Sequence, residues 1–112
     1  MYEDVIQISD ELATKEVLDF TEVAKSCIDL YSKKNHDYGN SFDKGMDNIG
    51  IPYGVGRIYD KMNRLVTLTK EEAQVKDESI DDTLRDLACY SMMMLAYRKR
   101  EIERKQSTIN FE

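Results

Sequence analysis

Most of this chain lacks the residues that interrupt helices. Its five glycines and its single proline all lie between Gly39 and Gly56, so neither flank of that window contains one. Glycine and proline are the least favourable residues in a helix interior. Their absence therefore predicts long helices on both sides of the window.

The chain is also poor in side chains that build zinc sites or activated nucleophiles. It has one histidine, His36, and two cysteines, Cys27 and Cys89, that show no metal-type spacing. A structural zinc site needs four closely arranged nitrogen or sulfur ligands, and no Ser/His/Asp or Cys/His arrangement is readable. Nucleophilic catalysis is therefore disfavoured, and both cysteines are predicted to be buried free thiols.

Long hydrophobic runs are absent. The longest apolar run, residues 92–97, is too short to cross a bilayer. The start, MYEDVIQ, lacks the basic and apolar regions of a secretory signal. The net charge of −6 argues against general nucleic-acid binding. We expect a cytoplasmic protein that does not contact membranes.

Apolar residues recur at helical spacing in three segments, 15–34, 57–74 and 79–105. No strand pattern competes with them, apart from a short stretch within residues 1–15 that reads as an N-terminal arm or a brief strand. At 112 residues, one domain is the natural count. The sequence therefore predicts a single all-α domain, a helical bundle with a long glycine-rich loop over residues 36–56.

The third predicted helix has two faces that we expect to be covered rather than exposed to solvent. Ile80, Leu84 and Leu87 define one stripe, while Tyr90 and Met93 lie on the other side. A helix that is apolar on both sides is usually buried between neighbours. Because three helices cannot easily surround it, we expect a homo-oligomer to complete the bundle. The Met and Tyr stripe is either packing of this kind or a ligand surface.

Two acids of this helix and one of the second helix are candidate metal ligands. Asp82 and Asp86 are one turn apart and can reach one ion together, with Asp60 as a third ligand. The alternative for Asp82 is that its carboxylate only stabilises the positive helix N-terminus. For Asp86, nearly two turns in, a ligand or ion-pair role is favoured.

The second helix also carries a row of cations. Arg57, Lys61 and Arg64 share the side opposite its apolar stripe. Arginine and lysine are the expected contacts of phosphate oxygens. The alternative is a solvated face with an Asp60–Arg64 pair worth a few tenths of a kcal/mol.

The glycine-rich window combines rings, charges and flexible backbone, and it is interpreted as a lid or base-recognition segment. Tyr38, Phe42 and Tyr53 can stack on a nucleobase, or they can form the small core that anchors the loop. The remaining polar candidates of this window are His36, Asp37 and Lys44.

Three segments carry a family resemblance: KNHDYGNSFDKG, GVGRIYDKMNRL and DESIDDTLRDLACY. They resemble the phage and bacterial family called nucleotide modification associated domain 1, and more distantly the all-α NTP pyrophosphohydrolases of the MazG and dimeric dUTPase kind. That enzyme superfamily implies helical bundles, dimers or tetramers, and Mg²⁺ held by ExxE and ExxD motifs on two helices. Here Asp86 matches the final Asp, Thr83 stands at the expected Glu, and Asp60-x-x-Asn63 takes the place of ExxE.

The resemblance implies a nucleotide-binding protein, and three hypotheses follow. In the first, the protein is a Mg²⁺-dependent nucleoside triphosphate pyrophosphohydrolase in which Asp82 and Asp86 hold the metal and position water. In the second, a phage anti-defence protein sequesters a cyclic or ADP-ribose-type signal without cutting it. In the third, the chain is a structural helper in a phage nucleotide-modification complex. Tyr90, on the second face of the third helix, completes the predicted ligand-binding set.

Overall fold

Over the residues that the structure describes, the chain folds into four α-helices preceded by a short 3₁₀ helix, Asp10–Leu12. In the computed structural model, the backbone of residues 9–38, 40–70 and 73–111 is described, together with the side chains of residues 9–36, 40–70 and 80–108. The helices are α1 (Lys15–Tyr38), α2 (Ser41–Ile49), α3 (Ile51–Leu68) and α4 (Ala73–Phe111). No strand occurs within these ranges, so the predicted all-α class is confirmed.

The predicted loop over residues 36–56 is wrong, because most of this window is helical. α1 continues to Tyr38, and α2 and α3 fill residues 41–49 and 51–68. Two positive φ angles mark the turns between these helices, +62° at Asn40 and +93° at Gly50. Pro52 lies in the first turn of α3, where a missing N–H costs no helical hydrogen bond.

Two of the glycines in this window serve close packing between helices. A Cβ atom at Gly45 would overlap the ring of Tyr53, and one at Gly54 would overlap the side chain of Met94. A helical glycine costs about 1 kcal/mol relative to alanine. The close contacts that these positions permit offset that cost, which is why a glycine-rich stretch forms helices here.

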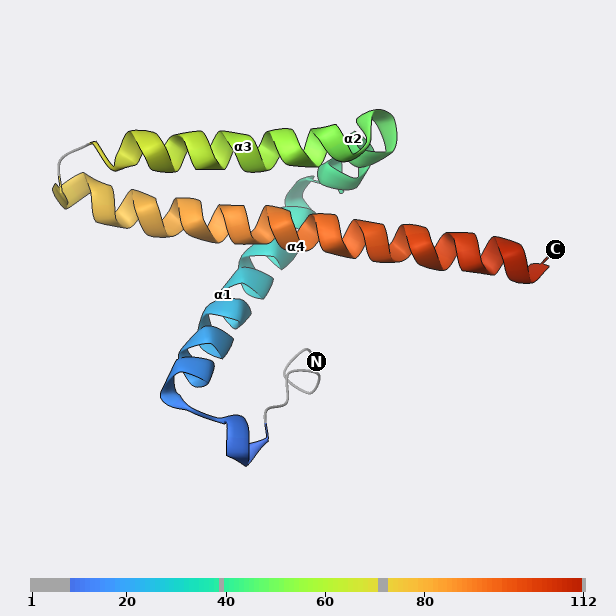
Figure 1. Cartoon of the computed structure of the whole chain (residues 1–112). Helices are drawn as coiled ribbons and strands as arrows, with labels where there is room; N and C mark the ends of the chain where they lie inside the picture. Colours follow the sequence, from blue (N-terminus) through green and yellow to red (C-terminus); the bar gives the residue numbers. More distant parts are fainter. Residues whose placement is uncertain (1–8, 39, 71–72, 112) are drawn as a thin grey trace.

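α3 and α4 form a long antiparallel hairpin, and α1 crosses the middle of α4 (Figure 1). The C-terminal half of α4 extends past the start of α3, and the N-terminal half of α1 projects away from the hairpin (Figure 1). The radius of gyration is 17.2 Å, against about 13 Å for a compact chain of ~100 residues. A single copy is therefore an open arrangement of helices.

The core of one copy is small and lies where α1, α2 and α3 meet α4. Its buried apolar residues are Cys27, Phe42, Met46, Leu68 and Cys89. Thr83, at the position where the hydrolase pattern has Glu, is also buried.

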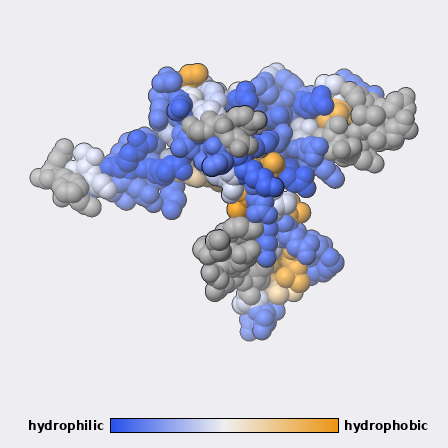
Figure 2. Space-filling model, turned by 180° about the vertical axis from the view of Figure 1, so that it is seen from behind, coloured by the Kyte–Doolittle hydropathy of each residue, from blue (hydrophilic) through white to orange (hydrophobic). Residues whose placement is uncertain are grey.

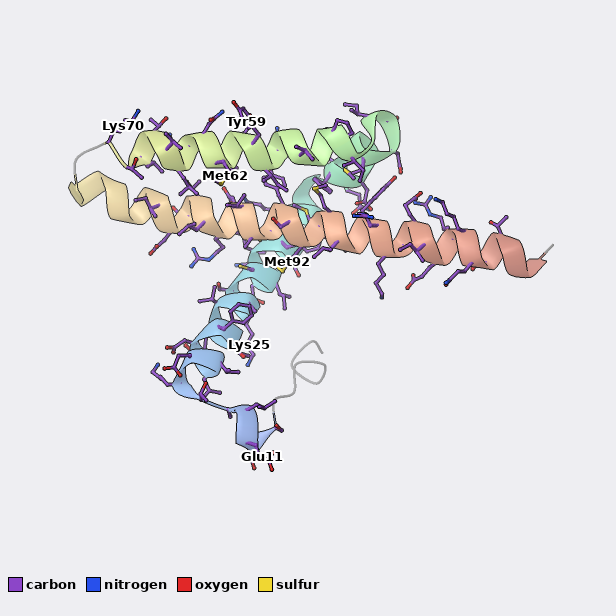
Figure 3. All side chains as sticks on the ribbon, viewed as in Figure 1. Glu11, Lys25, Tyr59, Met62, Lys70 and Met92 are labelled. Carbon is purple, nitrogen blue, oxygen red and sulfur yellow. The ribbon has the colours of Figure 1, made fainter. Side chains whose placement is uncertain are left out.

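Many large apolar side chains remain on the outside of this structure. The predicted apolar stripe of the last helix is not fully buried in one copy, because Leu84 is 47% exposed. Further along α4, Leu95 and Ile102 are exposed as well. On the projecting part of α1, Phe20 is 76% exposed and Val23 is also exposed. Apolar side chains gather on this projection amid hydrophilic neighbours (Figure 2). Tyr59 extends from α3 on the side away from α4 (Figure 3).

α2 is held against α4 by two polar contacts. The Tyr97 hydroxyl donates to Asp47 Oδ1 at 2.5 Å, and Arg100 Nη2 lies 2.7 Å from Asp43 Oδ2. The hydrogen bond to Asp47 raises the pKa of Tyr97, because the carboxylate accepts the phenolic proton. Among the described helices, none combines the length and apolarity needed to cross a membrane.

Candidate functional site

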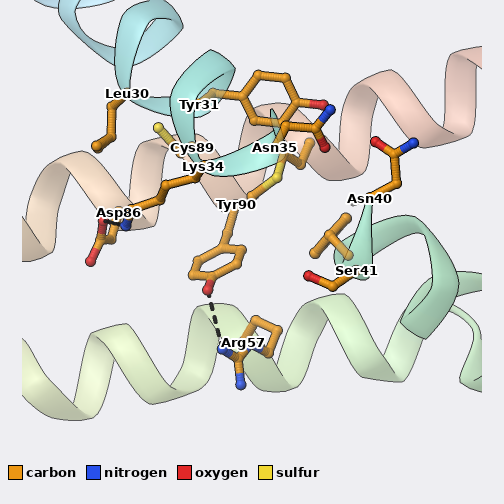
Figure 4. A pocket seen from close by; sticks show the side chains of 12 residues that line it. Leu30, Tyr31, Lys34, Asn35, Asn40, Ser41, Arg57, Asp86, Cys89 and Tyr90 are labelled. Atoms are coloured by element: carbon orange, nitrogen blue, oxygen red, sulfur yellow. Dashed lines mark hydrogen bonds and ion pairs between the residues drawn. The ribbon is translucent and has the colours of Figure 1, made fainter. Parts of the chain in front are cut away.

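A cavity of about 340 Å³ lies where all four helices approach one another. α1 contributes Tyr31 and Lys34 to its walls, α2 contributes Phe42, and α3 contributes Arg57. α4 forms the opposite wall with Asp86, Cys89, Tyr90 and Met93 (Figure 4). Side chains that are far apart in the sequence thus face one space.

The carboxylate of Asp86 lies between two lysines. Lys34 Nζ of α1 is 3.3 Å from Oδ1, and Lys61 Nζ of α3 is 3.3 Å from Oδ2. Asp86 and Lys61 are half-buried, whereas Lys34 is exposed. Two cations share one carboxylate, so this corner of the cavity carries an excess of positive charge.

Arg57 adds a third cation on the α3 side. Its Nη2 donates to the Tyr90 hydroxyl at 3.2 Å (Figure 4). The guanidinium carbon also lies 5.4 Å from the centroid of the Tyr90 ring, a cation–π distance. The hydrogen bond from Arg57 to Tyr90 is the largest cause of a raised pKa at Arg57. Arg57 therefore stays charged and is held at the edge of the cavity.

An aromatic cluster begins in the wall of the cavity, which Phe42 and Tyr90 line, and extends to Tyr53. The Phe42 ring is 5.9 Å from that of Tyr90 and 5.6 Å from that of Tyr53, centroid to centroid. Phe42 is buried, and Tyr53 lies against the backbone of Gly45. These rings join α2, α3 and α4, so they position Tyr90 rather than offering an open stacking face.

Cys89 lines the cavity and contacts Cys27 of α1, and both cysteines are buried. The Cys89 thiol donates to the Cys27 carbonyl oxygen at 3.6 Å, and both thiols are free, as predicted. Burial, with the nearby Cys27, raises the pKa of Cys89 from 9.0 to about 11. Cys89 is therefore protonated near neutral pH and is a poor nucleophile.

The structure brings some of the predicted ligand residues together and leaves others apart. Asp86, Tyr90 and Arg57 line the cavity, and Lys61 reaches it through Asp86. Tyr53 does not line the cavity itself, but its ring contacts that of Phe42, which does. Three predicted residues are exposed and do not line the cavity: His36, Lys44 and Arg64. The side chains of Asp37 and Tyr38 lie outside the described residues.

The acids predicted to hold a metal do not converge on one point. Asp82 is 73% exposed and lies 3.8 Å from Arg85, while Asp60 is 67% exposed and lies 4.0 Å from Arg57. Within the described ranges, no three His, Cys, Asp or Glu side chains are grouped to hold a metal ion. Asp86, paired with two lysines, does not by itself fit a divalent cation.

Sequence reasoning missed several residues of the cavity. Lys34 was interpreted only as the end of a helix. Phe42 was among the rings predicted to stack on a base or to form a small anchoring core, and it is buried. The available signal was helical spacing, because Leu30, Tyr31 and Lys34 recur at i, i+1 and i+4 on one side of α1. That spacing shows a shared face, but it does not indicate which helix the face meets.

A comparison with family models matches a region that contains most of the residues lining this cavity. Residues 34–97 match the model of the family described as nucleotide modification associated domain 1. No curated protein and no solved structure matches the chain. The matched range runs from Lys34 to Tyr97 and so includes the two lysines, Asp86 and Arg57.

Proposed function

The chain belongs to the nucleotide modification associated domain 1 family, and from that premise we propose that it binds a nucleotide in the cavity around Asp86. The phosphates occupy the corner formed by Lys34, Lys61 and Arg57. One observation carries this proposal: Lys34 and Lys61, from two different helices, converge on a single carboxylate at 3.3 Å each.

Electrostatics support an exchange of partners at this corner. The Asp86 carboxylate carries one negative charge, whereas a di- or triphosphate carries several. An ion pair near the surface contributes only about 0–1 kcal/mol, so the exposed Lys34 can leave Asp86 at little cost. A phosphate chain that accepts from both lysines and from Arg57 replaces that weak pair with several charge-assisted hydrogen bonds.

Binding is better supported than hydrolysis. The hydrolase hypothesis needs several acids that hold Mg²⁺ together. Asp60 and Asp82 instead pair with arginines, and no three acids are grouped to hold an ion within the described ranges. We therefore propose sequestration or delivery of an intact nucleotide as the function, in line with the second of the three hypotheses. Release of pyrophosphate in a turnover measurement would instead support the pyrophosphohydrolase hypothesis.

We also propose that the working form is a homo-oligomer. The apolar side chains exposed on α1 and on the outer side of α4 leave more apolar surface in contact with water than a monomeric protein usually does. In most homo-oligomers the same surface of each copy contacts the other copy. A second copy of this chain is therefore the partner that we expect to cover these side chains.

The test is calorimetric titration of the protein with nucleoside triphosphates, with Mg²⁺ and with a chelator, alongside a pyrophosphate-release assay. We expect stoichiometric binding that does not require the metal, and recovery of intact nucleotide after heating. Lys34→Ala and Lys61→Ala each weaken binding about tenfold or more, since each removes one phosphate contact. Lys70→Ala, at the exposed end of α3, is the matched control and leaves the affinity unchanged. Absence of binding to every nucleotide would reject the proposal.

A further inference from the structure

A second cavity, of about 270 Å³, adjoins the first one beside the crossing of α1 and α4. Tyr31, Cys89 and Met93 line both cavities, so the two spaces share a wall. The first cavity alone is near the lower limit of ligand pockets, which span roughly 300–1,000 Å³. Together the two spaces are large enough for a ligand with two chemically different ends.

The second cavity is chemically unlike the first. Its walls are mostly apolar and rich in sulfur, with Cys27, Ile28, Met92 and Ala96 beside the shared residues. Met92 lies on the side of α4 that faces α1 (Figure 3). Thioether sulfur makes favourable contacts with flat π systems, and methionine adapts its shape to them. A phosphate finds no lysine there, whereas a planar ring system finds a suitable surface.

A charged pair lies at the edge of this apolar space. Arg100 Nη2 and Asp43 Oδ2, 2.7 Å apart, both line the second cavity and are partly exposed. Arginine offers only donors and a carboxylate only acceptors. Side by side, they match the mixed donor and acceptor edge of a nucleobase.

Two aromatic rings that line the first cavity are already engaged, because Arg57 covers Tyr90 and Phe42 is buried. The ring of Tyr31 lines the second cavity as well as the first. A base that needs a flat contact surface therefore finds it on the sulfur-rich side. We propose that the second cavity holds the nucleobase of a nucleotide whose phosphates lie on Lys34 and Lys61, with the sugar across Tyr31 and Met93. This inference rests on the proposed function and adds the site of the base.

Inorganic triphosphate separates the two ends of the ligand, because it has phosphates and no base. We expect the wild-type protein to bind a nucleoside triphosphate at least tenfold more tightly than inorganic triphosphate in calorimetry. Ala96→Phe fills the second cavity, abolishes this difference and leaves the triphosphate affinity unchanged. Ser91→Phe, on the exposed side of α4 and outside both cavities, is the matched control and changes neither affinity.

Two further variants make the outcome decisive. Met92→Ala removes a thioether without adding bulk, and it weakens nucleotide binding about fivefold with no effect on triphosphate. Asp43→Asn changes the order of affinity among the four bases, again without altering triphosphate binding. The inference is overturned if Ala96→Phe and Met92→Ala bind nucleotide as the wild type does, or if triphosphate binds equally well. If neither triphosphate nor any nucleotide binds, the proposed function itself fails.

Discussion

Asp86 is the residue on which the interpretation of the site depends. Its two carboxylate oxygens each meet a lysine, one from α1 and one from α3. Two roles require an acid at this position: holding a metal ion, or competing with phosphate for the two lysines. Removing the carboxylate weakens binding of the Mg²⁺–nucleotide complex in the first role and strengthens phosphate binding in the second. The surroundings of Asp86 favour the competitor, since they are cationic.

Removing Asp86 is therefore expected to strengthen phosphate binding. In Asp86→Ala, Lys34 and Lys61 no longer share a carboxylate, and the affinity for inorganic triphosphate rises a few-fold in calorimetry. Asp82→Ala serves as the control, because Asp82 is exposed and lies outside the cavity. If Asp86 instead holds Mg²⁺, Asp86→Ala weakens the binding of the Mg²⁺–nucleotide complex.

The Cys89 thiol gives a pH dependence of stability. Its pKa is about 11 in the folded protein and 9.0 when unperturbed, so the folded state holds the proton more tightly. Stability from this group is complete below pH 9 and falls as the pH rises from 9 towards 11, because the unfolded state loses its proton first.

Chemical denaturation of the wild type and of Cys89→Ala measures this effect. Between pH 8 and pH 11, the free energy of unfolding of the wild type falls relative to the variant by roughly 2–3 kcal/mol, at ~1.4 kcal/mol per pKa unit. Parallel curves for the two proteins would show that Cys89 titrates with an ordinary pKa.

At the scale of the elements, α2 and α3 depend on glycines that allow close approach. An exposed helical Gly→Ala change usually stabilises, because alanine is the better helix former. At Gly45 and Gly54 the added methyl group instead meets a packed side chain, the Tyr53 ring or Met94. Helix propensity and packing thus act in opposite directions at these two positions.

We expect packing to decide the outcome. Gly45→Ala and Gly54→Ala each lower the free energy of unfolding by about 1–3 kcal/mol, the usual cost of overpacking. Gly56→Ala is the matched control, because a Cβ there meets nothing within 4 Å. This control stabilises by about 0.5–1 kcal/mol through propensity alone. Thermal or urea unfolding followed by circular dichroism distinguishes the three variants, and stabilisation by Gly45→Ala would contradict the close packing.

At the scale of the whole molecule, the open shape and the exposed apolar surface belong together. The helices of one copy extend over 59 × 41 × 23 Å, and α1 projects from the α3–α4 hairpin (Figure 1). Phe20, on this projection, is 76% exposed. Such a surface is costly in water, at ~25 cal/mol for each Å² of apolar area left exposed. A second copy that covers it would convert an open arrangement into a closed bundle.

Sedimentation or light scattering tests this expectation. We predict an oligomeric wild type, and a Phe20→Lys variant that shifts towards monomer while its helical circular dichroism is kept. Ser32→Lys adds the same charge to exposed α1 surface and leaves the oligomeric state unchanged. A monomeric wild type at micromolar concentration would contradict the prediction.

Much of the fold was readable from the sequence, and the errors have a common cause. The flanking helices followed from apolar spacing and from the absence of glycine and proline there. The 36–56 window was misread as a loop, because the packing of Tyr53 on Gly45 that makes a helical glycine acceptable joins two different helices. α4 likewise begins at Ala73, earlier than its predicted start at residue 79.

The site was readable in part for the same reason. Periodicity placed Arg57 and Lys61 on one side of a helix and Asp86 and Tyr90 on one side of another, and these residues do meet. The sequence by itself determined the long helices on either side of the 36–56 window, their faces and the chemistry that each face carries, since these depend on neighbours along the chain. Only the tertiary structure decided that Lys34 and Lys61, from two different helices, share the carboxylate of Asp86. This contact depends on how α1 and α3 pack against α4, which no local pattern encodes.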